Sequence, residues 1–528
     1  MKILKATGLF IPPAYQGSYP PLGTAALVGF LREKGLRAFQ GDLNISFLDY
    51  IKRNKLEKIL TPEYRAEKIR KGVYYYKILQ YQGISQSLSY EFENIPGSSY
   101  AFTERILSSR HLLCYLGDEK ENFFVNFFHQ EVSPRIQKEQ YDLVGFSITG
   151  PSQVVASFTF GYLIKRFFPR IKIVIGGQWV SFFREEIQKK AILKNFFDFA
   201  IFFEGETPLY KLIQSLQKGS GLSRVPNLIF RNQGKWEWSD QVSEEDMDSL
   251  PAPDFDGLPL NKYAGSKKGI SLTFETARGC YWNRCVFCVD LPLPKPRYRE
   301  KDPDLVIRDM KHLIKKYGVK HLMISNPTFS PWQMKKITRR MLQGKIQLSW
   351  WAMARLDNEF DMETLRLAKK SGCMMMGFGV ESMNQRVLDF LEKGTKVNVI
   401  RRIVKDAHDL NLPIYFQMML GLPSETQEEA LDTLGFLINN PDALEREPVF
   451  NIYYLIPHNK VFLSPGKYGI IIKKCLPLPF RFFYPFEHVT GKVDLGNAQK
   501  LIRFYEVARQ RKRLKHFQNP QGSEYLLV

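Results

Sequence analysis

The sequence predicts an α/β protein with two successive units, each built on a mainly parallel sheet, and a small α-rich region at its end. Short apolar runs alternate with amphipathic helices twice along the chain, and an acidic, proline-rich stretch over residues 236–270 separates the two series. The 528 residues also suffice for about three domains of ordinary size. We therefore expect a first unit over 1–235, a linker over 236–270, a second unit over 271–466 and a C-terminal extension over 467–528.

The composition is that of a globular protein. The hydrophobic fraction is 44% and the charged fraction is 24%, which excludes a disordered or collagen-like chain. No window approaches the roughly 18 uninterrupted apolar residues of a membrane span, and the first residues lack the pattern of a cleaved signal peptide. We therefore expect a soluble, cytoplasmic protein without a membrane span.

The net charge of +21 allows two interpretations. It comes from 75 Lys and Arg against 54 Asp and Glu. Such an excess can mark an RNA, membrane or acidic-peptide partner, but it also fits a lysine-rich surface that simply faces water. No Arg/Gly-rich tract or RNA-recognition signature is present, so we expect no nucleic-acid partner.

The same two interpretations apply to a basic amphipathic helix expected over Leu501–His516. Its expected apolar face holds Leu501, Phe504 and Tyr505, and its basic run begins at Arg509. The basic run is either a docking surface for a peptide or nucleic acid, or a solvated helix face.

The first unit has the pattern of an open, doubly wound, Rossmann-like sheet. Strand-length apolar runs alternate with segments whose apolar residues recur at helical spacing. Regularity is lost over residues 50–137, which we expect to be a helical insertion. The expected strands are Lys2–Leu9, Ala38–Leu43, Leu143–Ile148, Ile171–Ile175 and Phe197–Phe203.

Glycines and polar residues gather where three of these strands end. Ligands of open parallel sheets bind at the carboxyl ends of the strands, so these residues are candidate ligand contacts. Alternatively, the glycines merely end strands, as any α/β unit requires. The candidates are Ser147, Thr149, Gly150, Gly176, Gly177, Gln178, Glu204, Gly205 and Glu206.

The second unit contains about six strand–helix repeats without a nucleotide fingerprint. This pattern predicts a (β/α)6 partial TIM barrel, whose site should lie at the carboxyl ends of the strands. The expected strands are Ser271–Glu275, His321–Ser325, Ser349–Met353, Met374–Val380, Pro413–Leu420 and Phe450–Leu455.

Three of the six cysteines lie within nine positions, directly after the first strand of this unit. Cys280, Cys285 and Cys288 present three thiols on one loop, which suits an iron–sulfur cluster or zinc. Zinc needs a fourth ligand, and neither His312 nor Cys373 is near in sequence. Three ligands leave one iron of a four-iron cluster open. The alternatives are a zinc site with a distant ligand, or three unrelated core cysteines.

The second half of this loop carries a family resemblance. Cys285-Val286-Phe287-Cys288 resembles the end of the signature of radical S-adenosylmethionine (radical SAM) enzymes: Cys, three residues, Cys, any residue, an aromatic, Cys. The first half departs, because four residues rather than three separate Cys280 from Cys285. The resemblance implies a 4Fe-4S cluster on the three cysteines and Phe287 beside the adenine of S-adenosylmethionine (SAM).

Segments at three later strand ends resemble the family's SAM-binding segments. One is similar to its Gly-x-Glu-Ser segment, one places an arginine like the residue that pairs with the SAM carboxylate, and one resembles the turn beside adenine. The residues implied to bind SAM are Arg355, Gly377, Gly379, Glu381, Ser382, Gly421 and Leu422. Alternatively, Arg355 and Glu381 form a surface ion pair, and the turn is an ordinary one.

The first unit resembles the cobalamin-binding domain that precedes the barrel in many radical SAM enzymes. The similar segments are Pro20–Gly23, Gly145–Gly150, Ile175–Gly177 and Glu204–Glu206. No Asp-x-His-x-x-Gly motif is present, since the first histidine is His111, so cobalamin would be held without a histidine ligand. The candidate contacts named above would then bind cobalamin. The alternative is an α/β unit that has lost cobalamin.

The resemblance implies an enzyme that uses a 4Fe-4S cluster, SAM and cobalamin. Reductive cleavage of SAM would give a 5′-deoxyadenosyl radical, which would abstract hydrogen from an unactivated carbon, and methylcobalamin would deliver a methyl group. We expect a peptide or small-molecule substrate and an electron donor such as flavodoxin or ferredoxin.

Three other functions were weighed. Cyclisation or rearrangement would use the same cofactors without methyl transfer. Transfer RNA methylthiolation needs three more cluster cysteines in the first unit, which has only Cys114, so we reject it. A non-catalytic RNA-binding protein would hold zinc and no iron.

Overall fold

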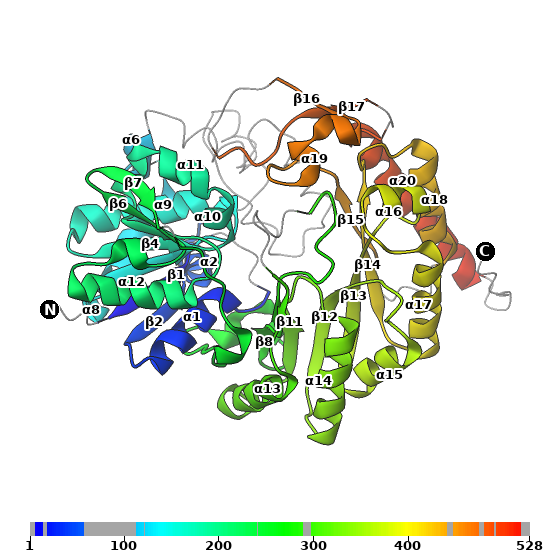
Figure 1. Ribbon diagram of the computed structural model, residues 1–528, viewed down its shortest axis with the longest axis horizontal. Coiled ribbons are helices and arrows are strands. Elements are labelled where there is room, and N and C mark those ends of the chain that lie inside the picture. The colour runs from blue at the N-terminus through cyan, green and yellow to red at the C-terminus, as the bar shows by residue number, and fades with distance from the viewer. Residues whose placement is uncertain are drawn as a thin grey trace. The chain divides into compact units, whose positions relative to one another are not determined.

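The chain forms two compact units in the computed structural model (Figure 1). The first comprises Met1–Thr273 with Pro477–Arg481, and the second comprises Phe274–Leu476 with Phe482–Val528. The structure describes residues 6–13, 18–56, 112–120, 122–239, 241–288, 297–440, 447–474, 480–489 and 493–518. Within these ranges, no helix is both long and apolar enough to cross a membrane.

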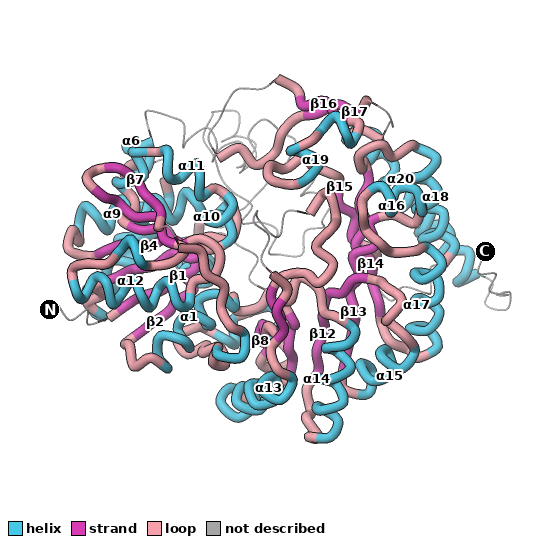
Figure 2. The backbone as a smooth tube through the Cα atoms, viewed as in Figure 1, coloured by secondary structure: helices cyan, strands magenta, loops and turns pink. Residues whose placement is uncertain are grey.

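The first unit is built on a seven-stranded sheet (Figure 2). Its strand order is β2-β1-β3-β4-β5-β6-β7, and the pairings from β2 to β5 are parallel, as the sequence predicts. The strands are β1 (Thr7–Ile11), β2 (Ala38–Asp42), β3 (Leu143–Ser147), β4 (Lys172–Gly176), β5 (Phe199–Ile201), β6 (Leu228–Asn232) and β7 (Lys235–Trp238).

The sheet ends in an antiparallel hairpin that the sequence analysis did not anticipate. β6 pairs with β5 and β7 in antiparallel fashion, and β7 continues to Trp238, inside the stretch expected to be linker. The turn between them is Gln233-Gly234, and both residues have positive φ angles. A two-residue turn of this kind matches the twist of paired strands, and it closes the hairpin despite the polar residues around it.

Helices cover this sheet, and some of them belong to the expected insertion. They are α1 (Leu22–Glu33), α2 (Leu43–Arg53), α6 (Leu112–Leu116), α7 (Phe123–Phe127), the π-helix η3 (Phe128–Val132), α8 (Ser133–Glu139), α9 (Val154–Phe167), α10 (Gln178–Phe182), α11 (Arg184–Lys189) and α12 (Glu206–Lys218). The end of the 50–137 segment is thus helical as expected, whereas residues 57–111 lie outside the described ranges. Phe47 packs against Phe124 and Phe127 with ring centroids 5.1 Å apart in each pair, so aromatic packing fixes these short helices.

The second unit contains the predicted partial barrel. Its six-stranded sheet has the order β15-β14-β13-β12-β11-β8, and the pairings from β11 to β15 are parallel. The strands are β8 (Ser271–Phe274), β11 (His321–Ile324), β12 (Ser349–Arg355), β13 (Cys373–Glu381), β14 (Ile414–Leu420) and β15 (Val449–Ile452), and the boundary between the two units falls before the last residue of β8. The sheet curls, and helices line its outer side in Figure 1. The fold class predicted from the sequence is confirmed.

The barrel helices begin and end where local signals place them. They are α13 (Pro303–Tyr317), α14 (Pro331–Gln343), α15 (Met362–Lys370), α16 (Gln385–Phe390), α17 (Val397–Asp409) and α18 (Gln427–Asn439). Asp302 caps α13 by accepting a hydrogen bond from the Asp304 N–H, and Gly318 ends the helix in the left-handed conformation.

Short elements complete the chain. Two small antiparallel hairpins are formed by β9 (Ala277–Arg278) with β10 (Arg299–Glu300), and by β16 (Ile470–Ile472) with β17 (Phe486–His488). The short helix α19 (Lys460–Leu463) and the terminal helix α20 (Leu495–Gln518) follow the barrel. Single 3-10 turns are η4 (Pro151–Gln153), η5 (Ala191–Asn195), η6 (Leu222–Arg224), η7 (Met247–Ser249), η8 (Leu260–Lys262), η9 (Ala264–Ser266) and η11 (Pro465–Tyr468).

The terminal helix corrects two expectations about its faces. Phe504 was placed on the buried face, but 53% of it is exposed, whereas Leu501 and Tyr505 are buried as expected. Arg509 was placed in an accessible basic run, but it is only 2% exposed. Its Nε lies 2.9 Å from a Glu447 carboxylate oxygen, and it donates a hydrogen bond to the Tyr505 hydroxyl. The buried face is therefore rotated toward Arg509, which is not available to a docking partner.

Candidate functional site

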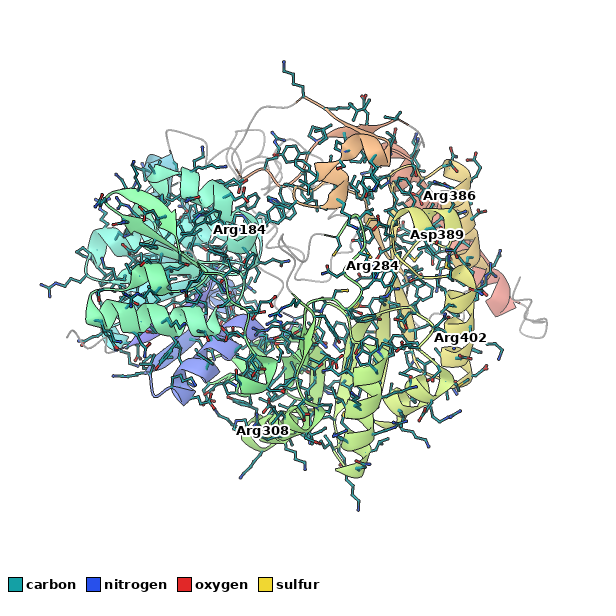
Figure 3. The ribbon with its side chains drawn as sticks, viewed as in Figure 1. Arg184, Arg284, Arg308, Arg386, Asp389 and Arg402 are labelled. Atoms are coloured by element: carbon teal, nitrogen blue, oxygen red, sulfur yellow. The ribbon has the colours of Figure 1, made fainter. Side chains whose placement is uncertain are left out.

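The three clustered cysteines lie on the loop that follows β8 and β9. Cys280, Cys285 and Cys288 are all partly exposed and none is in a disulfide. Arg284, labelled in Figure 3, is exposed on the same loop. The loop thus presents three cysteine side chains at the carboxyl ends of the barrel strands, where the sequence predicts the site.

Hydrogen bonds from three other segments hold this cysteine loop in place. The Val286 N–H donates to the Leu391 carbonyl at 3.0 Å, and the Trp282 indole N–H donates to the Glu392 carbonyl at 2.7 Å. The Tyr281 hydroxyl donates at 2.5 Å to the carboxylate of Asp357, which follows β12. Before α19, the side-chain amide of Asn459 donates to the Phe287 carbonyl at 3.2 Å. Each bond contributes about 1 kcal/mol, so together they fix the loop before any ligand binds.

Apolar packing against the core also holds the cysteine loop in place. Val286 is completely buried in a cluster with Leu391, Leu422 and Tyr453, and Phe287 packs against the edge of this cluster. Sequence reasoning treated Val286 only as the variable position of the motif. The structure shows that this position anchors the loop in the core.

The four-residue spacing between Cys280 and Cys285 is accommodated by two local features. Asn283 has a φ of 48°, and asparagine tolerates this left-handed conformation better than most residues. The Trp282 ring packs directly against Gly394, whose φ is 68°, and a Cβ at that position would overlap the ring. The longer loop therefore folds over the segment after α16 without disturbing the barrel.

Arg355 and Glu381 lie at the ends of the neighbouring strands β12 and β13. They are 6% and 7% exposed, so the alternative of a surface ion pair is wrong. The Arg355 guanidinium stacks over the Trp282 ring, with its central carbon 4.0 Å from the ring centroid, and it donates to the Lys393 carbonyl. Glu381 instead accepts a hydrogen bond from the Lys393 ammonium at 3.0 Å.

An irregularity in β13 aims Glu381. The register between β13 and β14 shifts between Gly379 and Glu381, and Glu381 has a φ of 70°. Bulges of this kind redirect a side chain and often store strain beside functional sites. A Cβ at Gly379 would lie 3.0 Å from the Glu381 carboxylate, and one at Gly377 would overlap the Met353 and Tyr415 side chains. Both glycines therefore leave room at this strand end.

Lys393 is a site residue that sequence reasoning missed. It is 7% exposed, and its ammonium lies 5.8 Å from the Phe287 ring centroid. Burial lowers its pKa, but the Glu381 carboxylate and the Cys285 thiol raise it, and the net direction is upward. Conversely, burial raises the pKa of the Cys285 thiol, while Lys393 and Arg355 oppose that shift. A lysine directly before a glycine was the available signal, but nothing in sequence linked it to Glu381.

The remaining predicted SAM contacts have structural roles as well. The Ser382 hydroxyl lies 3.2 Å from the Thr433 hydroxyl of α18, and the Leu422 side chain is completely buried. The N–H groups of Gly421 and Leu422 donate to the Glu425 carboxylate at 2.8 and 3.2 Å. Burial raises the pKa of Glu425 to about 8. These contacts shape the turn after β14, so any ligand contact of Leu422 would be made by its backbone.

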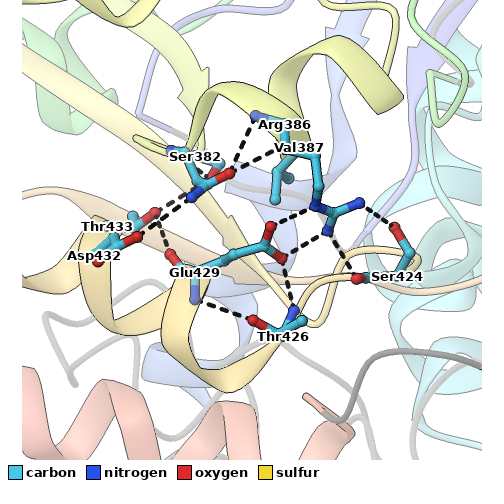
Figure 4. Close-up of polar contacts among 9 residues, drawn as sticks. Ser382, Arg386, Val387, Ser424, Thr426, Glu429, Asp432 and Thr433 are labelled. Atoms are coloured by element: carbon cyan, nitrogen blue, oxygen red, sulfur yellow. Dashed lines mark hydrogen bonds and ion pairs between the residues drawn. The ribbon is translucent and has the colours of Figure 1, made fainter.

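A polar network fixes this turn to α16 (Figure 4). The Arg386 guanidinium donates to both Glu429 carboxylate oxygens and also to the Ser424 hydroxyl and carbonyl. Thr426 and Glu429 form a capping box at the start of α18. The turn and the segment that carries Lys393 are thereby connected through α16.

The candidate contacts of the first unit lie at the ends of three adjacent strands. Ser147 ends β3 and pairs in register with Gly176 at the end of β4, and β5 is the next strand. Thr149 and Gln178 are exposed at this edge. Gly177 has a φ of 101°, and a Cβ there would lie 2.5 Å from the Ile148 carbonyl oxygen. The structure thus brings these residues to one edge of the sheet.

Gln153, which sequence reasoning missed, organises the loop after β3. It is buried, and its side-chain oxygen accepts hydrogen bonds from the Thr149 N–H at 2.7 Å, the Thr149 hydroxyl at 2.8 Å and the Gly150 N–H at 3.3 Å. Its amide group donates to the Pro12 carbonyl at 2.9 Å. The Gln153 side chain therefore holds the Thr149–Gly150 backbone in place through these hydrogen bonds.

The acidic turn after β5 is used within the unit. A carboxylate oxygen of Glu204 accepts a hydrogen bond from the Glu245 N–H at 2.5 Å, and Glu245 in turn accepts from the Thr207 N–H and hydroxyl. Glu206 is buried in the first turn of α12, where a negative charge favours the helix. Gly205 faces Leu27 of α1. These contacts give the turn a structural role.

The donor set of the cysteine loop fits an iron–sulfur cluster. Soft thiol ligands and two buried cations suit an anionic cluster. Among the residues that the structure describes, no three His, Cys, Asp or Glu side chains converge on a point that could hold one metal ion. In a four-iron cluster each thiolate binds its own iron, so the ligands need not converge in that way.

Residues 274–437 match the family model described as the radical SAM superfamily. The second unit therefore contains a radical SAM domain, as the cysteine motif predicts.

Two curated relatives extend beyond that domain. A protein of Pyrococcus horikoshii named as an uncharacterized methyltransferase is 28% identical over 309 residues, which cover 58% of this chain and 66% of that protein. An anaerobic magnesium-protoporphyrin IX monomethyl ester cyclase of Cereibacter sphaeroides is 23% identical over 315 residues, which cover 58% of this chain and 50% of that protein. The chain thus spans between half and two thirds of the length of these relatives.

A solved structure shares the fold over almost the whole chain. It is the cobalamin-dependent S-adenosylmethionine radical enzyme OxsB with aqua-cobalamin and S-adenosylmethionine bound, and it aligns with a TM-score of 0.63 and 15% identity. The alignment covers 97% of this chain and 67% of that one. The expected architecture, an α/β unit followed by a radical SAM barrel, is therefore confirmed at the level of the fold.

Proposed function

We propose that this chain is a cobalamin-dependent radical SAM enzyme and that the reaction it catalyses is methyl transfer. The observation that carries the proposal is the cysteine loop itself. Three partly exposed cysteine side chains lie on a loop that hydrogen bonds and packing hold beside the buried side chains of Arg355, Glu381 and Lys393. This is a preorganised site with both signs of charge at the carboxyl ends of barrel strands.

In this proposal Cys280, Cys285 and Cys288 hold a 4Fe-4S cluster, and SAM binds at the adjoining strand ends. The bound cluster would supply the electron for reductive cleavage of SAM. Arg355 is suited to pair with the SAM carboxylate, because its guanidinium is held rigidly on Trp282. Glu381 offers a carboxylate acceptor for the SAM amino group.

Space and exclusion of water would come from other residues of the barrel. Gly377 and Gly379 carry no side chain where SAM would approach the strand end, and Phe287 offers an apolar surface for adenine. Gly421 would contribute backbone beside the adenine, and Leu422 would do the same. Ser382 contributes through its backbone, since its hydroxyl is engaged with α18.

Cobalamin would bind at the strand ends of the first unit. The fold shared with OxsB supports this part of the proposal, and so does the positive φ of Gly177, which lets the backbone turn tightly against Ile148 at this strand end. The contacts would be Ser147, Thr149, Gly150, Gly176, Gly177 and Gln178, with the turn Glu204–Glu206 beside them. Gln153 would hold the Thr149–Gly150 loop in its binding shape.

The second candidate function is cyclisation or rearrangement with the same cofactors. The cyclase relative of Cereibacter sphaeroides favours it, whereas the methyltransferase relative of Pyrococcus horikoshii favours methyl transfer. A peptide or small-molecule substrate and a flavodoxin or ferredoxin donor remain predictions.

The first experiment is a measurement of iron, cobalt and zinc per chain after anaerobic purification from cells supplied with cobalamin. The proposal predicts about four irons and one cobalt for the wild type, and loss of iron with retained cobalt for the triple variant C280A/C285A/C288A. Anaerobic reduction in the presence of SAM should then release 5′-deoxyadenosine. Iron without cobalt would exclude methyl transfer from cobalamin and would favour a cyclisation or rearrangement that needs no cobalamin, and zinc alone would refute the proposal.

A further inference from the structure

Lys393 lies in the segment that follows the Gly-x-Glu-Ser motif and is not among the residues implied to bind SAM, yet its contacts connect Arg355, Glu381 and Phe287. Its ammonium bonds to Glu381 at 3.0 Å, and its carbonyl accepts a hydrogen bond from Arg355. The same ammonium lies near the Phe287 ring and interacts electrostatically with Cys285. Lys393, which follows α16 in the chain, therefore contacts residues at the ends of β12 and β13 and lies near the cysteine loop.

The position of Lys393 is enforced by its surroundings. The preceding residue, Glu392, accepts the Trp282 indole hydrogen bond through its carbonyl, and the following residue, Gly394, lies under the Trp282 ring. A side chain at Gly379 would come within 3.3 Å of the ammonium, so the strand leaves space for it. A lysine held this firmly in a buried site is a fixed charge rather than a mobile surface cation.

We propose that Lys393 is a positioning residue for the reaction: its buried ammonium fixes the Glu381 carboxylate and supplies a positive charge beside Phe287 of the cysteine loop that raises the reduction potential of the cluster. This inference rests on the proposed function, since it assumes that the loop holds a cluster. Net charge near a cluster helps set its potential, because reduction adds a negative charge that a neighbouring cation stabilises.

The two parts of the inference predict different effects of three substitutions. Lys393→Met removes the cation, so the cluster potential should shift to more negative values. Glu381→Gln keeps the shape but leaves Lys393 uncompensated, so the potential should shift to more positive values. The double variant K393M/E381Q removes both charges, and its potential should return toward that of the wild type.

The positioning role predicts a loss of SAM affinity. With its partner removed, Glu381 is free to leave the orientation that the bulge in β13 gives it. Lys393→Met should therefore weaken binding of SAM by about tenfold or more, the size typical for loss of a residue that orients a binding group. Lys393→Arg keeps the charge but changes the geometry, so it should preserve the potential and still weaken binding of SAM.

The experiment is a redox titration followed by electron paramagnetic resonance, with iron content and SAM binding measured on the same samples. Lys396→Met is the matched control, because Lys396 lies three residues further on, is exposed, and pairs with Asp389. It should change neither the potential nor the binding of SAM. If Lys393→Met does not fold, the positive shift expected for the isosteric Glu381→Gln tests the charge effect by itself.

The possible failures are distinguishable. A wild-type protein without iron would refute the proposed function. A wild-type protein with iron whose potential is unchanged in Lys393→Met and in Glu381→Gln would leave the function intact and overturn this inference alone.

Discussion

The two units present their candidate residues in different ways at the carboxyl ends of their strands. In the barrel, charged side chains are buried and interlocked, as Arg355, Glu381 and Lys393 show. In the first unit, the edge consists of backbone, glycine and small hydroxyl groups, and its acidic residues are engaged within the unit. The difference teaches that one site is defined by fixed charge and the other by available space.

Among the variants that should affect one unit and not the other, Gly394→Val is expected to have the largest effect. The new side chain would overlap the Trp282 ring and would need a positive φ, so we expect a loss of about 3 kcal/mol or more of unfolding free energy. Iron content should fall, because Trp282 helps to hold the cysteine loop, while cobalt content should persist. Thermal unfolding and metal analysis measure both effects. Gly435→Ala, where a Cβ meets open space, is the control and should leave both unchanged or slightly improve stability.

Gly177→Ala should affect the first unit and leave the barrel unchanged. Its φ of 101° and the nearby Ile148 carbonyl predict a destabilisation of about 2 kcal/mol. Cobalt content should fall while iron content stays at the wild-type level. Equal loss of both metals would contradict the view that the two sites are shaped separately.

Gln153→Leu tests how far the first site depends on one buried side chain. The backbone donors of Thr149 and Gly150 would lose their acceptor, which should cost about 2 kcal/mol. Cobalamin binding, followed by its visible absorbance, should weaken without any change in iron content. Unchanged cobalamin binding would show that the loop after β3 is not part of that site.

The last effect is spread over a range of pH and concerns the turn after β14. Burial raises the pKa of Glu425 from 4.5 to about 8, so the folded state keeps a proton that the unfolded state releases. Stability should therefore fall as the pH rises from about 4.5 to about 8, by at most about 1.4 kcal/mol per pH unit. Glu425→Gln should remove this part of the slope in denaturant titrations at several pH values. An identical slope in the variant would show that Glu425 is ionised in the fold.

The barrel was predictable from sequence because its strands are six apolar runs that are separated by amphipathic helices. The predicted strand Pro413–Leu420, for example, differs from β14 only at its first residue. The hairpin β6–β7 was missed because its strands are short, because each combines apolar residues with polar or charged ones, and because its turn residues give only a weak local signal. Phe504 and Arg509 were misplaced because helical spacing does not reveal which face meets the rest of the fold.

The site was predictable only in part. The cysteines, Arg355 and Glu381 have sequence signals that place them at strand ends, and the structure brings Arg355, Glu381 and Cys285 together. Lys393 has only the weak signal of the glycine that follows it and Gln153 has none, because their roles arise from hydrogen bonds with residues elsewhere in the sequence. Side chains that support a site through packing and hydrogen bonds are therefore the part that sequence patterns leave out.

The left-handed Asn283 and the ring of Trp282 also bear on how proteins of this kind are found. A search pattern that demands three residues between the first two cysteines would pass over this chain, although its barrel and strand ends are complete. An aromatic residue that rests on a distant glycine would be a more dependable marker of such lengthened loops. Sequence changes at positions 282 and 394 would then have to occur together, because a larger residue at either one excludes the other.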